Sequence, residues 1–294
     1  MNTVVVDLKD STSSSRKTKD AVFLGALWVA TLIGLLTLFV LVITTAVDTQ
    51  GRLNFDLLRN FPSPFPEDAG IQSALFGSLW VVVTSGVVSL FLAIGSAIFL
   101  EEFSRSESRF YRLITVNIQT LAGVPSIVYG VLGLAFVVRG PLSWGFTVGS
   151  ASAVLTMMVL PVMIVAAREA LKAVPSSLRE GSYALGATKW QTISKQVLPA
   201  ATGGIATGSI LGVSRALGES APLILLGALA YVSSNPTGFD SDYTVLPLLI
   251  FKYATEAQEE FRAVGAAAII VLLLLLVTLN LLAIVIRDKT RKSW

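Results

Sequence analysis

An arginine and a glutamate stand four residues apart inside an otherwise apolar part of this chain. Arg215 and Glu219 are the only charged residues between Gln196 and Phe239. This spacing places both side chains on one helix face, and ionisable groups at membrane depth are costly and usually functional. Arg215 would offer a planar fork of donors to an oxyanion, with Glu219 holding it until the anion arrives. Alternatively, the two charges only neutralise each other and lock adjacent helices.

Small residues surround this pair. Three glycines at four-residue intervals lead up to it, and such stripes let helices pack backbone to backbone: Gly204, Gly208 and Gly212. Gly218 and Pro222 bracket the glutamate and weaken the helix there. Non-helical backbone at membrane depth is tolerated only within protein or beside a water-filled cavity, so a break here favours a pathway.

Polar residues interrupt the apolar pattern a second time in the segment 174–199, VPSSLREGSYALGATKWQTISKQVLP. Pro175 is expected to end or kink the incoming helix. Ser177 followed by Glu180 predicts a capping box, which would start a new helix.

The same segment predicts a second short helix. Gly186 fits a position just after a helix, where positive φ costs glycine little, and Thr188 followed by Gln191 predicts another capping box. Seven-residue spacings give each helix an apolar face: Leu178 with Leu185, and Tyr183 with Trp190 and Val197. The pair would dock another protein, or lie on lipid headgroups with Trp190 and Tyr183 as anchors.

The composition of the chain is typical of a membrane protein. Of the 294 residues, 53% are hydrophobic and 14% are charged, against about 25% charged in soluble domains. Six apolar stretches each exceed the roughly 20 residues that span a bilayer: 21–47, 71–100, 113–138, 140–167, 196–239 and 263–286. We therefore predict an all-α polytopic membrane protein with six transmembrane helices. The first stretch, 21–47, is too long for the apolar region of a signal peptide.

The basic residues predict the orientation. With both termini in the cytoplasm, 16 Lys and Arg fall on the inner side and 5 on the outer side, as the positive-inside rule requires. The predicted organisation is a cytoplasmic tail (1–20), a transmembrane domain (21–286, with the loop 174–199) and a second tail (287–294). Of the outer loops, 48–70 is predicted to be ordered, because it is rich in proline and turn residues. The segment 235–262 is predicted to be a solvated rim or, alternatively, a surface on which a partner docks.

Several kinds of chemistry are excluded by absent residues. The chain has no Cys and no His, which excludes disulfides, Cys or His metal sites and imidazole catalysis. No G-x-x-x-x-G-K-[ST] phosphate loop occurs in the sequence. We expect no cofactor and no nucleotide site, so ATP would be hydrolysed by a partner if it drives this protein.

The 174–199 segment resembles the "EAA" loop of ABC-importer permeases. That pattern runs Glu-Ala-Ala, three residues, Gly, nine residues, Ile-x-Leu-Pro; here Glu180, Gly186 and Leu198-Pro199 keep the spacing, while Gly181-Ser182 replace Ala-Ala and Gln196 replaces Ile. In that family the loop seats in a groove of the ATPase subunit. The resemblance implies an ATPase-coupling role for Ser177, Glu180, Gly186 and Trp190.

Two further segments are similar to signatures of the permease subunits of the bacterial phosphate-specific transporter: 214–223 (SRALGESAPL) and 121–130 (LAGVPSIVYG). The Ala-Pro-Leu ending favours the A-type subunit, and the resemblance covers about residues 70–286. It implies a type-I ABC importer fold, with Arg215 and Glu219 on the phosphate route. Pro125 would touch substrate, or merely kink a packed helix.

The resemblance implies partners as well: a homologous permease subunit, two ATPase subunits and an external phosphate-binding protein, in a bacterial plasma membrane. The nearest alternative is a permease for another oxyanion, such as sulfate, molybdate or a phosphonate. An ion-coupled secondary carrier would show internal repeats, and none is evident. A membrane-embedded enzyme is disfavoured, because the chain lacks His, Cys and a carboxylate cluster.

Overall fold

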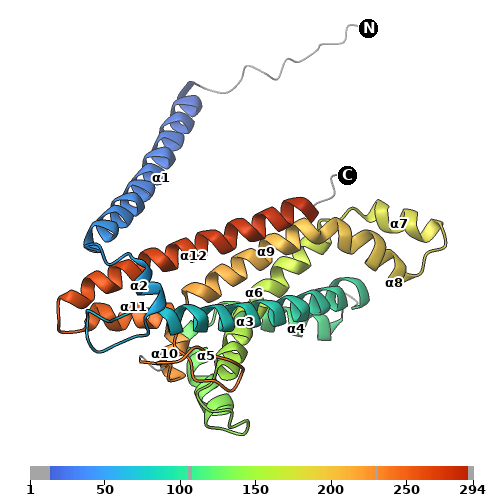
Figure 1. Cartoon of the computed structure of the whole chain (residues 1–294). Coiled ribbons are helices and arrows are strands. Elements are labelled where there is room, and N and C mark those ends of the chain that lie inside the picture. The colour runs from blue at the N-terminus through green and yellow to red at the C-terminus, as the bar shows by residue number, and fades with distance from the viewer. Residues whose placement is uncertain (1–13, 105–107, 229–230, 291–294) are drawn as a thin grey trace, which may run out of the picture. The chain divides into compact units, whose positions relative to one another are not determined.

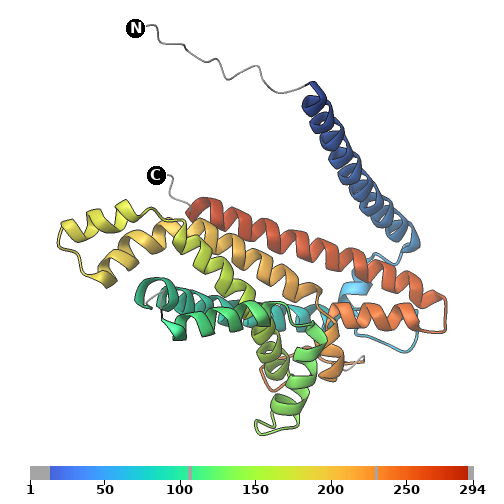
Figure 2. The ribbon, with the colours of Figure 1, turned by 180° about the vertical axis from the view of Figure 1, so that it is seen from behind.

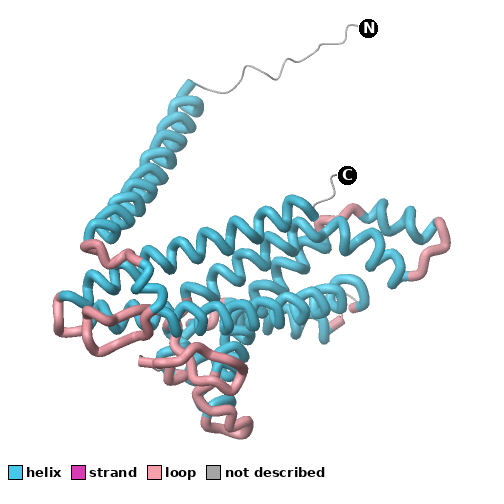
Figure 3. Tube along the Cα trace, viewed as in Figure 1, coloured by secondary structure: helices cyan, strands magenta, loops and turns pink. Residues whose placement is uncertain are grey.

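The computed structural model describes residues 14–104, 108–228 and 231–290, which are helical with irregular connections and contain no strand (Figure 3). The chain divides into two units, 1–48 and 49–294. The described part of the first unit is one 35-residue helix, α1 (Ser14–Asp48). The predicted tail 1–20 therefore includes the start of a helix, and residues 1–13 lie outside the described ranges.

The second unit is a bundle of long helices joined by short ones (Figures 1 and 2). In chain order its elements, with π-helical turns labelled η, are α2 (Phe55–Arg59), α3 (Gln72–Ile98), η1 (Phe99–Phe103), α4 (Arg109–Ala122), α5 (Ser126–Gly133), η2 (Leu134–Val138), α6 (Val148–Lys172), α7 (Ser176–Ala184), α8 (Lys189–Thr192), η3 (Ile193–Val197), α9 (Leu198–Gly218), α10 (Ala221–Leu225), α11 (Leu246–Thr255) and α12 (Glu260–Thr290). Including α1, the described residues hold five helices long and apolar enough to cross a membrane, or six if α4 and α5 with η2 count as one bent span.

The glycine stripe of α9 packs against α6, as its spacing predicts. A Cβ atom added to Gly208 would lie 2.3 Å from the Cβ of Ala166, and one added to Gly204 would lie 2.6 Å from the Cβ of Ala170. Since real Cβ atoms do not approach so closely, glycine is what lets the two backbones meet. α3 packs along α6 and also contacts α9, so these three helices form the centre of the bundle.

The predicted span 113–138 is a pair of helices, α4 and α5 with η2, bent by 101°. The break falls at residues 123–125 because Pro125 has no N–H to donate and disfavours helical backbone at the residue before it. The Tyr129 hydroxyl donates to the carbonyl of Leu121 across the break, at 2.8 Å. The kink that the sequence offered as one reading of Pro125 is thus confirmed.

The predicted span 196–239 is also shorter than expected. α9 ends at Gly218, Glu219 has extended backbone (φ −83°, ψ 114°), and the five-residue helix α10 follows. The break at Gly218 and Pro222 was predicted, but residues 231–239 form no helix. Glycine and proline there end the span rather than merely weakening it.

The prediction of a solvated rim at 235–262 is wrong for much of its length. The apolar run after Val245 forms α11, which packs against α12. Tyr243, Tyr253 and Phe261 are buried, and the Tyr253 hydroxyl donates to the carbonyl of Gly70 at 2.9 Å. Glu256, Glu259 and Glu260 all lie after the end of α11, so their charge does not describe the apolar segment before them.

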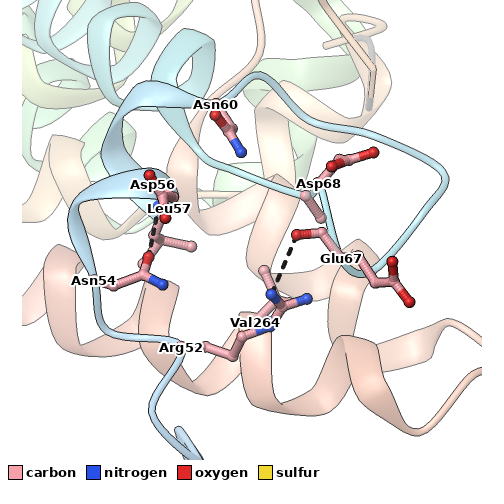
Figure 4. A pocket seen from close by; sticks show the side chains of 9 residues that line it. Arg52, Asn54, Asp56, Leu57, Asn60, Glu67, Asp68 and Val264 are labelled. Atoms are coloured by element: carbon pink, nitrogen blue, oxygen red, sulfur yellow. Dashed lines mark hydrogen bonds between the residues drawn. The ribbon is translucent and has the colours of Figure 1, made fainter.

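The loop 48–70 is ordered, as predicted. Asn54 caps α2 by accepting a hydrogen bond from the N–H of Leu57 at 3.0 Å. The Arg52 guanidinium donates to the carbonyl oxygen of Glu67 at 3.2 Å (Figure 4) and to that of Pro66. These contacts fold the loop around a cavity of about 190 Å³.

Candidate functional site

The Arg215–Glu219 pair lies at the carboxyl end of α9. The Arg215 Nε donates to a Glu219 carboxylate oxygen at 3.3 Å, and the two side chains are 40% and 20% exposed. Arg215 is in the last helical turn, where positive charge is favourable, and Glu219 is the first non-helical residue. This ion pair joins one helix end to its own cap, so it does not lock two helices together.

Two sequence motifs about ninety residues apart meet beside this pair. A Cβ atom on Gly130 would lie 2.7 Å from the Cα of Pro222, so the motifs 121–130 and 214–223 touch backbone to backbone. α5 and α10 accordingly lie against each other. Ser214, next to Arg215, hydrogen-bonds to Asn280 of α12. The charged pair therefore sits near a junction of α9, α10, α5 and α12.

The 174–199 segment forms a helical hairpin that projects from one end of the bundle (Figures 1 and 2). Gly186 has φ +79° just after α7, as predicted. The capping box at α8 is confirmed: Thr188 accepts from the N–H of Gln191 at 3.3 Å, and Gln191 accepts from the N–H of Thr188 at 2.8 Å. Ser182 and Thr192 hydroxyls, 2.9 Å apart, hold the two helices together.

The predicted capping box at the start of α7 is wrong. α7 begins at Ser176, and Pro175 occupies the position before it without any side-chain hydrogen bond. Ser177 thereby lies two residues beyond the capping position, too far into the helix to accept from the free N–H groups. Ser177 and Glu180 are exposed on the hairpin surface, as are Gly186 and Trp190.

The hairpin divides its apolar side chains between the bundle and the solvent. Val197 is buried, and Leu178 packs against the same cluster. Leu185 is 90% exposed, Trp190 is 59% exposed and Tyr183 is also exposed. The Leu178–Leu185 pair is thus split, and Val197 is separated from Tyr183 and Trp190 in the same way. The three exposed apolar side chains are available to a partner.

Two acidic residues at the end of the second span form ion pairs that the sequence did not predict. Glu101 pairs with Arg168 at 2.6 Å, and Glu102 pairs with Arg179 at 2.9 Å. In the sequence, Arg168 and Arg179 indicate only the positive charge expected on the inner side. The available signal was a pair of acids directly after an apolar run of thirty residues, 71–100.

A further polar cluster lies away from the hairpin. The Tyr231 hydroxyl donates to Glu256 at 3.1 Å, and the Lys252 ammonium lies 3.5 Å from the centre of its ring. Burial, reinforced by the Glu256 hydrogen bond, raises the pKa of Tyr231 to about 12. Tyr231 therefore stays a neutral hydrogen-bond donor at physiological pH.

A bundle of apolar spans, a charged pair at a helix break and an exposed helical hairpin together define a multi-pass helical membrane protein. Residues 89–292 match the model of binding-protein-dependent transport system inner membrane components, and the chain belongs to this family. That component is the membrane permease of such a system and not its ATPase, which implies ATPase and binding-protein partners.

The relatives confirm the resemblance to A-type permeases. The chain is 35% identical over 245 residues to the phosphate transport system permease protein PstA 1 of Mycobacterium tuberculosis, covering 82% of this chain and 78% of the relative. It is 30% identical over 281 residues to PstA of Yersinia pestis, covering 94% and 92%.

A solved structure confirms the predicted fold. A bacterial ABC transporter involved in the import of the acidic polysaccharide alginate superposes with a TM-score of 0.61 at 17% identity, covering 94% of this chain and all of that one. At this identity the likeness concerns the fold alone.

Proposed function

We propose that this chain is the A-type permease subunit of an ATP-driven importer that carries inorganic phosphate into the cytoplasm. The observation that carries the proposal is the similarity to PstA along 94% of the chain. The Arg215–Glu219 pair at the helix break supports it, because a guanidinium is the side chain best suited to an oxyanion. In this proposal Arg215 and Glu219 line the phosphate route, and Arg215 exchanges its carboxylate for the phosphate.

The proposed assembly contains a homologous permease subunit, two ATPase subunits and an external phosphate-binding protein. The hairpin would dock an ATPase subunit through Ser177, Glu180, Gly186 and Trp190. Its exposed apolar side chains and its projection from the bundle support this assignment. Phosphate would enter from outside and leave inside as the helices rock, with the hairpin as the coupling loop.

The substrate is tested by uptake in cells that lack their own phosphate importer and express the assembled transporter. We expect saturable uptake of radiolabelled phosphate that excess unlabelled phosphate suppresses and that sulfate, molybdate and phosphonates do not. Purification through a tag on this chain should also recover an ATPase subunit. Equal suppression by sulfate or molybdate would favour the alternative of a permease for another oxyanion.

The proposed orientation places both tails (1–20 and 287–294) in the cytoplasm, with the membrane domain between them (21–286). Because the chain has no Cys, single cysteines report topology cleanly. Glu67→Cys, in the ordered loop, should react with an impermeant thiol reagent in intact cells, and Ser13→Cys should react only after permeabilisation. Reaction of Ser13→Cys in intact cells would reverse the orientation.

A further inference from the structure

The second membrane span ends in a π-helical turn whose last three residues each contact a different helix. The turn is η1, and the residues are Glu101, Glu102 and Phe103. Their partners are Arg168 of α6, Arg179 of α7 and Lys189 of α8. π-Helical turns inside helices are rare and often occur at functional sites. We call these six residues the η1 clamp.

The first contact fixes η1 to the bundle. The Glu101 carboxylate accepts from the Arg168 Nε at 2.6 Å, and both side chains are almost fully buried. Arg168 also donates to the Tyr111 hydroxyl at 2.8 Å, and its guanidinium lies 5.4 Å from the centre of that ring. A buried charge is tolerated only when it is paired, so breaking this contact would be costly. Because η1 directly follows α3, the contact joins α3 to α4 and α6.

The second contact reaches the hairpin. The Glu102 side chain is 7% exposed and accepts from two Arg179 nitrogens, at 2.9 and 3.2 Å. The same guanidinium donates to the carbonyl oxygens of Leu171 at 2.9 Å and Val174 at 2.7 Å. Arg179 thus joins the end of α3 to the turn between α6 and α7, which a point charge such as lysine could not do.

The third contact lies on the other arm of the hairpin. The Lys189 ammonium sits 4.9 Å from the centre of the Phe103 ring, a favourable cation–π distance. α7 itself, all of whose residues the structure describes, contains no buried residue. Apolar packing therefore holds α7 only through the partly buried Leu178, whereas Ile193 and Val197 anchor the second arm in the bundle. The polar links to η1 are what fix α7 against the bundle.

We propose that the η1 clamp makes α3 move together with the coupling loop, so that it transmits ATPase motion into the membrane. This inference rests on the proposed docking of the ATPase at the hairpin. Without the clamp, the ATPase would still bind and displace the hairpin, but the displacement would not reach α3. Glu102 and Arg179 are positioning residues, since neither is placed on the phosphate route.

The test uses the complete transporter in proteoliposomes. The variants are Glu102→Gln, Arg179→Gln and the double variant, and the readout is phosphate transported per ATP hydrolysed. We expect ATPase subunits to be retained and the ratio to fall about tenfold, within the usual range of coupling between sites. The double variant should be no worse than either single variant, because the two residues act through one contact.

Glu169→Gln is the matched control. The substitution removes an acid next to Arg168, near the C-terminal end of α6. Glu169 forms only an exposed ion pair with Lys172, at 3.0 Å, and such pairs contribute little to stability. Its transport ratio should equal that of the unmodified transporter. Arg179→Lys should be intermediate, because it keeps the charge opposite Glu102 and loses the fork. If Glu102→Gln lowers the subunit level on a blot, Arg179→Lys decides the test.

An unchanged transport ratio in both Glu102→Gln and Arg179→Gln would overturn the clamp, as would loss of the ATPase subunit from them, which would make η1 part of the docking site. The docking assignment is judged separately by Trp190→Ala, which should reduce recovery of the ATPase subunit. Full recovery with Trp190→Ala would refute docking at the hairpin, whatever the transport ratio of the Glu102 variant.

Discussion

Arg215→Gln is expected to abolish phosphate uptake while the subunit remains assembled. Hydrogen bonds to charged groups contribute roughly 1.5–3 kcal/mol each, so a lost two-pronged contact should cost about 100-fold or more in transport. The remaining Glu219 carboxylate would also repel the anion. Assembly should survive, because a pair that is 40% and 20% exposed contributes at most about 1 kcal/mol to the fold.

The companion variants separate charge from shape. Arg215→Lys should retain a small part of the uptake, since an ammonium offers a point charge without the guanidinium fork. Glu219→Gln should be milder, because it removes repulsion together with the pairing. Arg139→Gln is the control: its guanidinium lies 5.6 Å from the centre of the Phe146 ring, the proposal gives it no role on the phosphate route, and uptake should stay near normal. Near-normal uptake in Arg215→Gln would remove Arg215 from the phosphate route.

The features that the sequence predicted correctly depend on neighbours along the chain. The positive φ of Gly186 and the Thr188–Gln191 box are set within a few residues, and the Gly208 contact follows from a helical repeat. The predicted Ser177–Glu180 capping box does not form, because Pro175 occupies the capping position of α7. The choice between Ser177 and its neighbours depends on where one helix begins, which a four-residue pattern does not determine.

The features that the sequence did not predict depend on distant partners. Proline explains a break at residues 123–125, but its 101° angle accompanies the packing of α5 against α10, where Gly130 meets Pro222. Glu101 and Glu102 find their arginines 67 and 77 residues away. No local pattern links them, and each acid alone resembles an ordinary charge at a membrane surface.

Gly186→Val is expected to lower both phosphate uptake and the recovery of the ATPase subunit. Gly186 has φ +79°, and nothing lies within 4 Å of an added Cβ atom. The substitution therefore causes no clash within this chain and acts through the backbone. A β-branched residue resists positive φ, where even an ordinary residue costs roughly 1–2 kcal/mol. The hairpin would relax by turning α8 relative to α7, which would change the position of Trp190 relative to Tyr183 and Leu185.

Gly186→Asn distinguishes this backbone effect from simple obstruction. Asparagine is close to valine in size but tolerates positive φ far better, so Gly186→Asn should keep most of the uptake and ATPase recovery that Gly186→Val loses. Equal losses in the two variants would mean that a side chain at this position blocks the partner directly. Full uptake and full ATPase recovery in Gly186→Val would refute the coupling role. They would show that a changed backbone between α7 and α8 affects neither docking nor the transmission of motion.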